Sequence, residues 1–401
     1  MKRKVLSILL SLTLMGALLA GCGEAAAPAS SAAPAAESGE ASAAPAASSD
    51  IKVGVIYIGD ENEGYTYSHM KGIDDMQANL GLSDAQIIEK TNIPEGEECY
   101  DAAVDLAEQG CNIIFANSFG HEDYMIQAAG EYPDIQFLHA TGFQAASSGL
   151  PNFHNYFTKI YEARYVSGIV AGMKLKEMID KGEVTADKAK IGYVGAYPYA
   201  EVVSGFTSFF LGARSIVESA TMEVQYTNSW ADMSMESEVA TKLIQDGCVL
   251  ISQHADTTGA PTACESAKVP CVGYNVDMIS VAPTCALTSP TNKWGAFYTI
   301  AVDSFMNGKE IPVDWAGGYA EDAVEITALN SDAIAEGTEE KVKEVEDALK
   351  AGTLHVFDVS TFTVDGKPIE DDLVSDGYYH ESEKVSAPSF SFIIDGITTQ
   401  E

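Results

Sequence analysis

The segment Val53-Gly54-Val55-Ile56-Tyr57-Ile58 is a continuous apolar run with the length and composition of a buried β-strand. A polar turn that contains glycine follows it. Met70, Ile73 and Leu80 then recur at the spacing of one face of a helix. A strand that is apolar on both faces and leads into a helix is typical of a parallel sheet covered by helices. This segment therefore predicts the first βα unit of an α/β fold.

The same alternation continues along the chain. Further strands of a first sheet are expected at 86–88, 112–116 and 135–138. Residues 152–157 are interpreted as a linking stretch, and a long helix is expected over about 161–178. A second set of strands is expected at 191–194, 223–226, 249–252 and 271–274. Two such sets predict two doubly wound parallel-sheet lobes with a ligand cleft and a hinge.

The beginning of the chain has the pattern of an export signal. A basic start at 2–4 precedes an apolar stretch, Val5–Leu19, that is short for a membrane span. The stretch ends in Leu19-Ala20-Gly21-Cys22, which is similar to the lipobox of bacterial lipoproteins. We expect a signal peptide at 1–21 and a lipid on Cys22. The alternative is an ordinary secretory signal with a chance cysteine.

The predicted domains follow from this start. Residues 22–50 hold no large apolar side chain and are expected to form a disordered tether. The folded body is expected to divide into an N-terminal lobe, 51–158 plus 286–318, and a C-terminal lobe, 159–285 plus 319–401. No later run has membrane-spanning length. The lipid is thus expected to hold the protein on the extracytoplasmic face of the cell membrane.

Charge and cysteine content exclude several classes of function. Lys plus Arg number 23 against 59 for Asp plus Glu, a net charge of −36, so a polyanion is repelled and nucleic acid is not an expected partner. No CxxC pair predicts zinc, and no cofactor is expected. Buried free thiols are expected, with Cys264 and Cys271 as the pair to consider should a disulfide form. The six cysteines after Cys22 are Cys99, Cys111, Cys248, Cys264, Cys271 and Cys285.

Candidate site residues follow the strands, because ligands of open parallel sheets lie beyond the carboxyl ends of the strands. These residues combine aromatic faces with directional hydrogen-bonding groups, a combination that suits a planar, polar-edged ligand such as a purine or its nucleoside. The candidates are Tyr65, Thr66, Tyr67, Asn117, Ser118, Phe119, Tyr197, Trp230, Asp232, His254, Asp256, Asn275, Asp277 and Lys293.

Each candidate also has a purely structural interpretation. The aromatic side chains can pack between loops, and Lys293 can be a solvated lysine at the start of a helix. Asp277 can cap a helix that begins near Met278. His254 and Asp256 resemble half of a metal site, but few other ligands are expected nearby, so no metal is predicted.

Covalent catalysis has little support in the sequence. Tyr165-Val166-Ser167-Gly168 lacks the first glycine of a nucleophile elbow and falls within a predicted helix. The turn at 59–64 lacks the lysine of a P-loop and the dinucleotide pattern. We therefore do not expect an enzyme.

Several short motifs together resemble the basic membrane protein (BMP) family, the lipoprotein substrate-binding proteins of ABC importers. The resemblance covers about 51–357 and implies the type I periplasmic-binding fold, a small-molecule ligand of the purine or purine-nucleoside type, and an ABC permease as partner. The motifs are Gly64-Tyr65-Thr66-Tyr67-Ser68-His69, Ser118-Phe119-Gly120, Ile191-Gly192-Tyr193-Val194-Gly195, Gly205-Phe206, Gly212-Ala213 and Gly273-Tyr274-Asn275-Val276-Asp277-Met278.

The chain departs from the nucleoside-binding branch of that family. The branch carries an Asn-Asp pair where this chain has Tyr65 and Thr66, and Asp where it has Asn275. The first loop is more similar to that of the branch associated with free purine bases such as adenine. Three alternatives stay open at this point: a sensor lipoprotein, a nucleoside-acting enzyme with the same cleft, and a receptor for a non-purine ligand.

Overall fold

The computed structural model describes residues 51–400. The predicted signal peptide, the tether and Cys22 lie outside the described residues. Within the described range, no helix combines the length and the apolar character that a membrane crossing requires.

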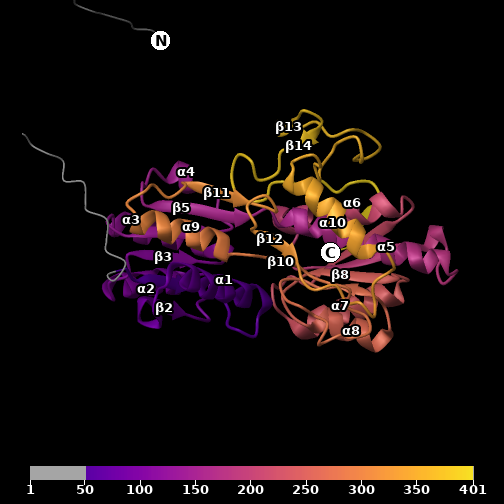
Figure 1. Ribbon diagram of the computed structural model, residues 1–401, viewed down its shortest axis with the longest axis horizontal. Helices are drawn as coiled ribbons and strands as arrows, with labels where there is room; N and C mark the ends of the chain where they lie inside the picture. Colours follow the sequence, from indigo (N-terminus) through magenta and orange to yellow (C-terminus); the bar gives the residue numbers. More distant parts are fainter. Residues whose placement is uncertain (1–50, 401) are drawn as a thin grey trace, which may run out of the picture. The chain divides into compact units, whose positions relative to one another are not determined.

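The first sheet is parallel and has the strand order β11-β5-β4-β3-β1-β2. Strand β1 lies next to the edge strand β2 and pairs on both sides, with Val53 opposite Ile87 of β2 and opposite Ile113 of β3. Helices α1 and α9 pack against each other beside this sheet (Figure 1). The strands are β1 (Val53–Ile56), β2 (Ile87–Lys90), β3 (Ile113–Ala116), β4 (Gln136–Ala140), β5 (Phe153–Thr158) and β11 (Asp314–Gly317). The helices are α1 (Gly64–Leu80), α2 (Glu97–Glu108), α3 (Glu122–Glu131), α4 (Ala145–Ser148) and α9 (Gly295–Met306), with 3-10 turns at Asp84–Gln86 and Phe119–His121.

The prediction of a linking stretch at 152–157 was wrong, because these residues form the buried strand β5. Polar residues in this strand conceal it in the sequence. They are nevertheless satisfied internally: the Nδ1 atom of His154 lies 3.0 Å from the carbonyl oxygen of Pro312, and Asn155 accepts a hydrogen bond of 2.7 Å from the amide of Ala145. A buried parallel strand can thus carry polar side chains where their partners are built in.

The second sheet is also parallel and has the order β15-β7-β6-β8-β9. Its strands match the second predicted set except for β15, which comes from the end of the chain. The strands are β6 (Lys190–Gly195), β7 (Thr221–Tyr226), β8 (Leu250–His254), β9 (Cys271–Val272) and β15 (Ile397–Gln400). The helices are α5 (Ile160–Asp180), α6 (Ala200–Ile216), α7 (Met233–Gln245) and α8 (Gly259–Ala267), with a 3-10 turn at Ala186–Lys188.

Helices α5 and α6 approach each other closely through glycine. A Cβ atom on Gly168 would collide with the carbonyl oxygen of Phe209, and one on Gly212 with that of Tyr165. Glycine at both positions lets the two helix backbones touch. The contact packs the second half of α6 against α5, and the first turn of the same helix carries the cavity residue Glu201.

The chain passes between the two sheets after β5, after β10 (Pro290–Asn292) and after β11. β10 pairs with β12 (Val324–Ile326) in an antiparallel ribbon. The predicted lobe boundaries at 158, 285 and 318 remain predictions. The remaining elements are α10 (Thr338–Lys350), β13 (Val374–Ser375) and β14 (Tyr378–Tyr379). The six cysteines among the described residues are buried and carry free thiols.

Candidate functional site

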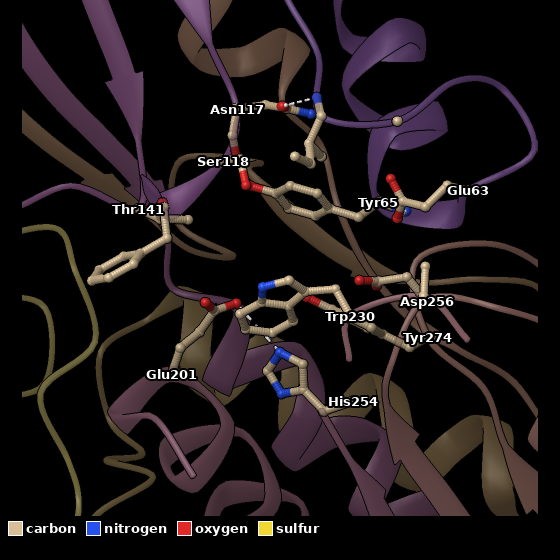
Figure 2. A pocket seen from close by; sticks show the side chains of 14 residues that line it. Glu63, Tyr65, Asn117, Ser118, Thr141, Glu201, Trp230, His254, Asp256 and Tyr274 are labelled. Atoms are coloured by element: carbon tan, nitrogen blue, oxygen red, sulfur yellow. Dashed lines mark hydrogen bonds and ion pairs between the residues drawn. The ribbon is translucent and has the colours of Figure 1, made fainter. Parts of the chain in front are cut away.

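The candidate site is a cavity of about 140 Å³ at the carboxyl ends of both sheets. Figure 2 shows Tyr65, Asn117 and Thr141, which follow from the first sheet, on one side of it, and Trp230, Glu201 and His254, which follow from the second, on the other. The cavity is lined by Ile58, Gly59, Glu63, Tyr65, Asn117, Ser118, Phe119, Thr141, Glu201, Trp230, Ala231, His254, Asp256 and Tyr274.

Tyr65 is held rigidly at the start of α1. Glu63 is the N-cap of this helix, and its carboxylate accepts hydrogen bonds of 2.8 Å from the amides of Tyr65 and Thr66. The Tyr65 hydroxyl donates to the carbonyl oxygen of Asn117 at 2.8 Å, and its ring contacts His69 edge to face at a centroid distance of 4.5 Å. The ring is therefore fixed at both ends and forms a preorganised aromatic wall.

Asn117 ties the ends of two strands together. Its Oδ1 atom accepts a hydrogen bond of 2.9 Å from the amide of Ile58, directly after β1. Ser118 donates to the carboxylate of Glu95 at 2.6 Å, and Phe119 stands at the rim with 47% of its surface exposed. Asn117 and Ser118 thus serve mainly to shape the loops around the cavity.

The opposite wall is a group of aromatic rings. Trp230 contacts Tyr197 edge to face at 5.1 Å between ring centroids, and Tyr197 stacks on Tyr199 at 5.1 Å. Tyr199 also lies 6.0 Å from Phe119, a ring contact between the two sides of the cleft. Tyr197 therefore supports Trp230 from behind instead of lining the cavity.

The polar edge of the cavity is built around Asp256, which is 7% exposed. Its Oδ1 atom accepts a hydrogen bond of 2.8 Å from Asn275. Asn275 has a φ of 61°, which turns the chain so that its side chain reaches both Asp256 and Asn292, the latter at 3.2 Å. The carbonyl oxygen of Asp256 accepts from the amide of Gly64 at 3.1 Å, so this loop also contacts the other side of the cleft.

Burial raises the pKa of Asp256 well above its ordinary value. Three neighbouring carboxylates raise it further, and the guanidinium of Arg164 opposes them. Burial also lowers the pKa of His254 to about 4, so this imidazole is neutral near pH 7. Its Nε2 atom lies 3.3 Å from the Glu201 carboxylate, which places the proton on that nitrogen. The three carboxylates around Asp256 are Glu63, Glu236 and Glu201.

Half of the predicted site residues line the cavity. They are Tyr65, Asn117, Ser118, Phe119, Trp230, His254 and Asp256. Thr66, Asn275 and Tyr197 lie one layer behind and hold lining residues or loops in place.

The other four predicted residues lie away from the cavity. Tyr67 is 41% exposed, and Asp232 caps α7 through the amide of Met235 at 2.9 Å. Asp277 accepts a hydrogen bond of 2.7 Å from the amide of Ile279 and closes a turn; no helix begins there. Lys293 pairs with Asp322 at 2.8 Å. Local hydrogen bonds and ion pairs therefore account for these charged side chains.

Sequence reasoning missed several lining residues. Glu63 precedes the first helix as an acidic N-cap, and Tyr274 is the last residue of a predicted strand; both patterns are visible in the sequence. Glu201 lies in the first turn of α6, and no local pattern singles it out. The missed residues are Ile58, Gly59, Glu63, Thr141, Glu201, Ala231 and Tyr274. Over residues 51–400, no group of three or more His, Cys, Asp or Glu side chains could hold a metal ion.

The sequence matches a family model described as ABC transporter substrate-binding protein, PnrA-like (Bmp), over residues 51–356. A purine-binding protein of Brucella abortus is 32% identical over 77% of this chain and 83% of its own length. A putative ABC transporter glucose-binding protein of Haloferax volcanii is 30% identical over 68% of this chain and 66% of its own length.

Solved structures share the fold. An ABC transporter solute-binding protein of Aeropyrum pernix superimposes with a TM-score of 0.62 at 15% identity, covering 77% of this chain and 93% of its own. One from Conexibacter woesei gives a TM-score of 0.61 at 18% identity, covering 76% and 98%. These neighbours and the matched family are solute-binding proteins, not enzymes. The chain therefore belongs to the PnrA-like Bmp family of ABC transporter substrate-binding proteins.

Proposed function

We propose that this protein is the lipid-anchored receptor of an ABC importer and that its cleft binds a purine base. Membership of the family implies a small-molecule ligand and a membrane permease as partners. The observation that carries the purine assignment is the combination of two aromatic walls, Tyr65 and Trp230, with a polar edge formed by the carboxyl groups of Asp256 and Glu201. The name of the Brucella relative, a purine-binding protein, supports the same ligand class.

The shape and chemistry of the cavity favour a base over larger or charged ligands. Its volume of about 140 Å³ is small beside the roughly 300–1,000 Å³ of sites for drug-sized molecules. Flat aromatic faces suit a flat ring, and carboxylate oxygens accept from ring and exocyclic N–H groups. None of the described lining residues is lysine or arginine, so a nucleotide phosphate would lack a counter-charge there.

The ligand is tested by native mass spectrometry of the purified protein, followed by calorimetry with adenine, guanine, hypoxanthine, adenosine and glucose. We expect a bound mass of a purine base, and tighter binding of at least one base than of adenosine. Glucose binding in the absence of purine binding would overturn the proposal. Incubation with adenosine and assay for free base separates a receptor from a nucleoside-acting enzyme, since a receptor releases adenosine unchanged.

The lipid anchor is tested with Cys22→Ser. Only an acylated thiol gives the mature chain stable membrane affinity in this proposal, so the variant should be shed or poorly exported and should not label with palmitate. Cys99→Ser is the matched control, because Cys99 is a buried thiol of the folded body and its loss should leave labelling unchanged. A Cys22→Ser protein that still labels and stays with the membrane would contradict the anchor.

A further inference from the structure

Helix α5 places an arginine against a residue that lines the cavity. Arg164 is 1% exposed and has no carboxylate within ion-pair distance among the described residues. A buried guanidinium without a paired carboxylate is costly, so its position calls for a reason beyond packing.

Two hydrogen bonds hold the guanidinium, and a glycine in α6 leaves the space that it occupies. Its Nη1 atom donates to the hydroxyl of Tyr193 at 2.6 Å and to the carbonyl oxygen of Gln253 at 3.0 Å. A Cβ atom on Gly205 of α6 would lie 2.7 Å from Nδ1 of His254 and 3.0 Å from Nε of Arg164. Glycine at 205 thus leaves room for the arginine and the histidine to pack against α6.

Arg164 also stacks on a residue that lines the site. Its guanidinium carbon lies 3.9 Å from the centroid of the Tyr274 ring, a cation–π contact. Tyr274 lines the cavity, and its hydroxyl has no hydrogen-bond partner among the described residues. The arginine therefore holds the ring of a lining residue in place through one of its faces.

The charge of Arg164 faces an excess of carboxylates. Asp256, Glu63 and Glu201 line the cavity, and Glu236 is buried close behind, with its Oε2 atom 3.3 Å from the amide of Thr257. In the low dielectric of a buried site, the positive charge of Arg164 favours the ionised form of Asp256 and opposes both burial and the neighbouring carboxylates.

We propose that Arg164 is a positioning residue of the ligand site: it holds Tyr274 against the cavity, and its charge favours the ionised, hydrogen-bond-accepting form of Asp256. This inference rests on the proposed function, because a purine base serves as the probe. Arg164 does not line the cavity itself, so it acts through Tyr274 and Asp256.

The charge effect gives the inference a pH signature. Ionised Asp256 is disfavoured by burial and by Glu63, Glu236 and Glu201, and it is favoured by Arg164. The other titratable groups around it are the phenols of Tyr65 and Tyr274 and the neutral imidazole of His254. Removal of the guanidinium should thus raise the pKa of Asp256. As the pH is lowered, the affinity for the base should therefore be lost at a higher pH than in the wild type.

The test compares Arg164→Gln, Arg164→Lys and the control Arg214→Gln by calorimetry with adenine between pH 5.5 and 9. Arg214 is the other arginine of the described residues, lies in α6 and also stacks on an aromatic ring, at 5.4 Å from Phe210, but it is remote from the cavity. We expect Arg164→Gln to bind about tenfold more weakly and its pH midpoint to rise by about one unit.

Arg164→Lys keeps the charge and loses the flat face. It should retain the wild-type midpoint but bind about threefold or more weakly. Arg214→Gln should match the wild type in both measurements. An Arg164→Gln protein with wild-type affinity and midpoint would overturn the inference. Should that variant fail to fold, Arg164→Lys decides alone, and wild-type affinity in it overturns the stacking role.

A readout without ligand separates this inference from the proposed function. The carboxyl carbon of Asp256, assigned as the NMR signal lost in Asp256→Asn, is titrated in the free wild type and in Arg164→Gln. A higher midpoint in the variant supports the inference even where the wild type binds no adenine, in which case the purine proposal alone fails. Equal midpoints overturn the charge role of Arg164.

Discussion

Asp256 and Asp277 are carboxylates of neighbouring loops with opposite surroundings. Asp256 is buried, is held by Asn275 and faces the cavity. Asp277 is exposed, and its carboxylate is used by the amide of Ile279. The same side chain therefore acts as a ligand-facing group in one loop and as a turn cap in the next, because only one of them is removed from water.

This difference predicts opposite effects of the same substitution. Asp256→Asn should weaken purine binding by about tenfold to a hundredfold, since a buried partner is lost at a cost of about 1–3 kcal/mol. Asp277→Asn should leave the affinity unchanged. Calorimetry on both variants measures these affinities. A loss of affinity in Asp277→Asn alone would show that the polar edge of the site lies in the loop of Asp277 and would contradict this assignment.

Buried carboxyls also predict how stability depends on pH. Burial raises the pKa of Glu236 from an ordinary value of 4.5 to about 7. The folded state then binds a proton that the unfolded state has released, so this stabilising contribution is complete below about pH 4.5 and is lost as the pH rises through 7. Glu162 acts in the same direction, because burial raises its pKa to about 7 as well.

Buried histidines act in the opposite direction, because burial lowers the pKa of His69, His139 and His254, and unfolding lets them bind protons below about pH 6.5. The comparison of Glu236→Gln with the wild type isolates the carboxyl group. Between pH 5.5 and 8, the stability of Glu236→Gln relative to the wild type should rise by an amount on the order of 2–3 kcal/mol, because glutamine has no such contribution to lose. Thermal unfolding of both proteins across this range measures the difference, and a difference that stays constant with pH would contradict the assignment.

At the scale of elements, the contact of α5 with α6 depends on the absence of side chains. Gly168→Ala would place a methyl group against the backbone of α6 and should destabilise the protein by about 1–3 kcal/mol through overpacking. Gly130 of α3 is the matched control, because its Cβ would meet nothing within 4 Å. Gly130→Ala should be stabilising by up to about 1 kcal/mol from helix propensity. Urea unfolding measures both, and equal midpoints would contradict the contact.

The sequence predicts well those elements whose apolar pattern is not interrupted by polar residues. The run at 53–58 contains β1, and the apolar residues Met70, Ile73 and Leu80 belong to α1. β5 was missed because His154 and Asn155 interrupt its apolar residues, and their partners come from Pro312 and Ala145, which no local pattern reveals. The periodicity of apolar residues does not predict a strand whose polar side chains find their hydrogen-bond partners in distant parts of the chain.

The candidate site could also be predicted only in part from the sequence. The segments that follow β1, β3 and β8 carry Tyr65, Asn117 and Asp256, as the rule for parallel sheets predicts. Asp277 misled the prediction because the left-handed turn at Asn275 redirects the chain before it. Arg164 lies near the start of α5, and only the folded arrangement brings its guanidinium over the Tyr274 ring.

At the scale of the whole body, ligand binding should close the cleft. Contacts such as Gly64 to Asp256 and Phe119 to Tyr199 join the two sides around the cavity, and an opening motion of the hinge must break them. Solution scattering should thus give a smaller radius of gyration with a saturating purine than without it. Tyr199→Ala should shift the ligand-free protein toward the larger radius, and profiles identical in all conditions would exclude the motion.

Both sheets are completed by strands from late in the chain, since β11 pairs with β5 and β15 pairs with β7. A polypeptide that is threaded out of a cell with its N-terminus first would therefore have each sheet open at one edge until these last strands arrive. Unpaired edge strands can pair with other polypeptide chains before folding is complete, and pairings between segments that are distant in the sequence form slowly. Loss of the β15 residues Ile397–Gln400 would thus leave β7 as an unpaired edge strand. We expect aggregation during biogenesis, rather than loss of binding, to be the first visible defect.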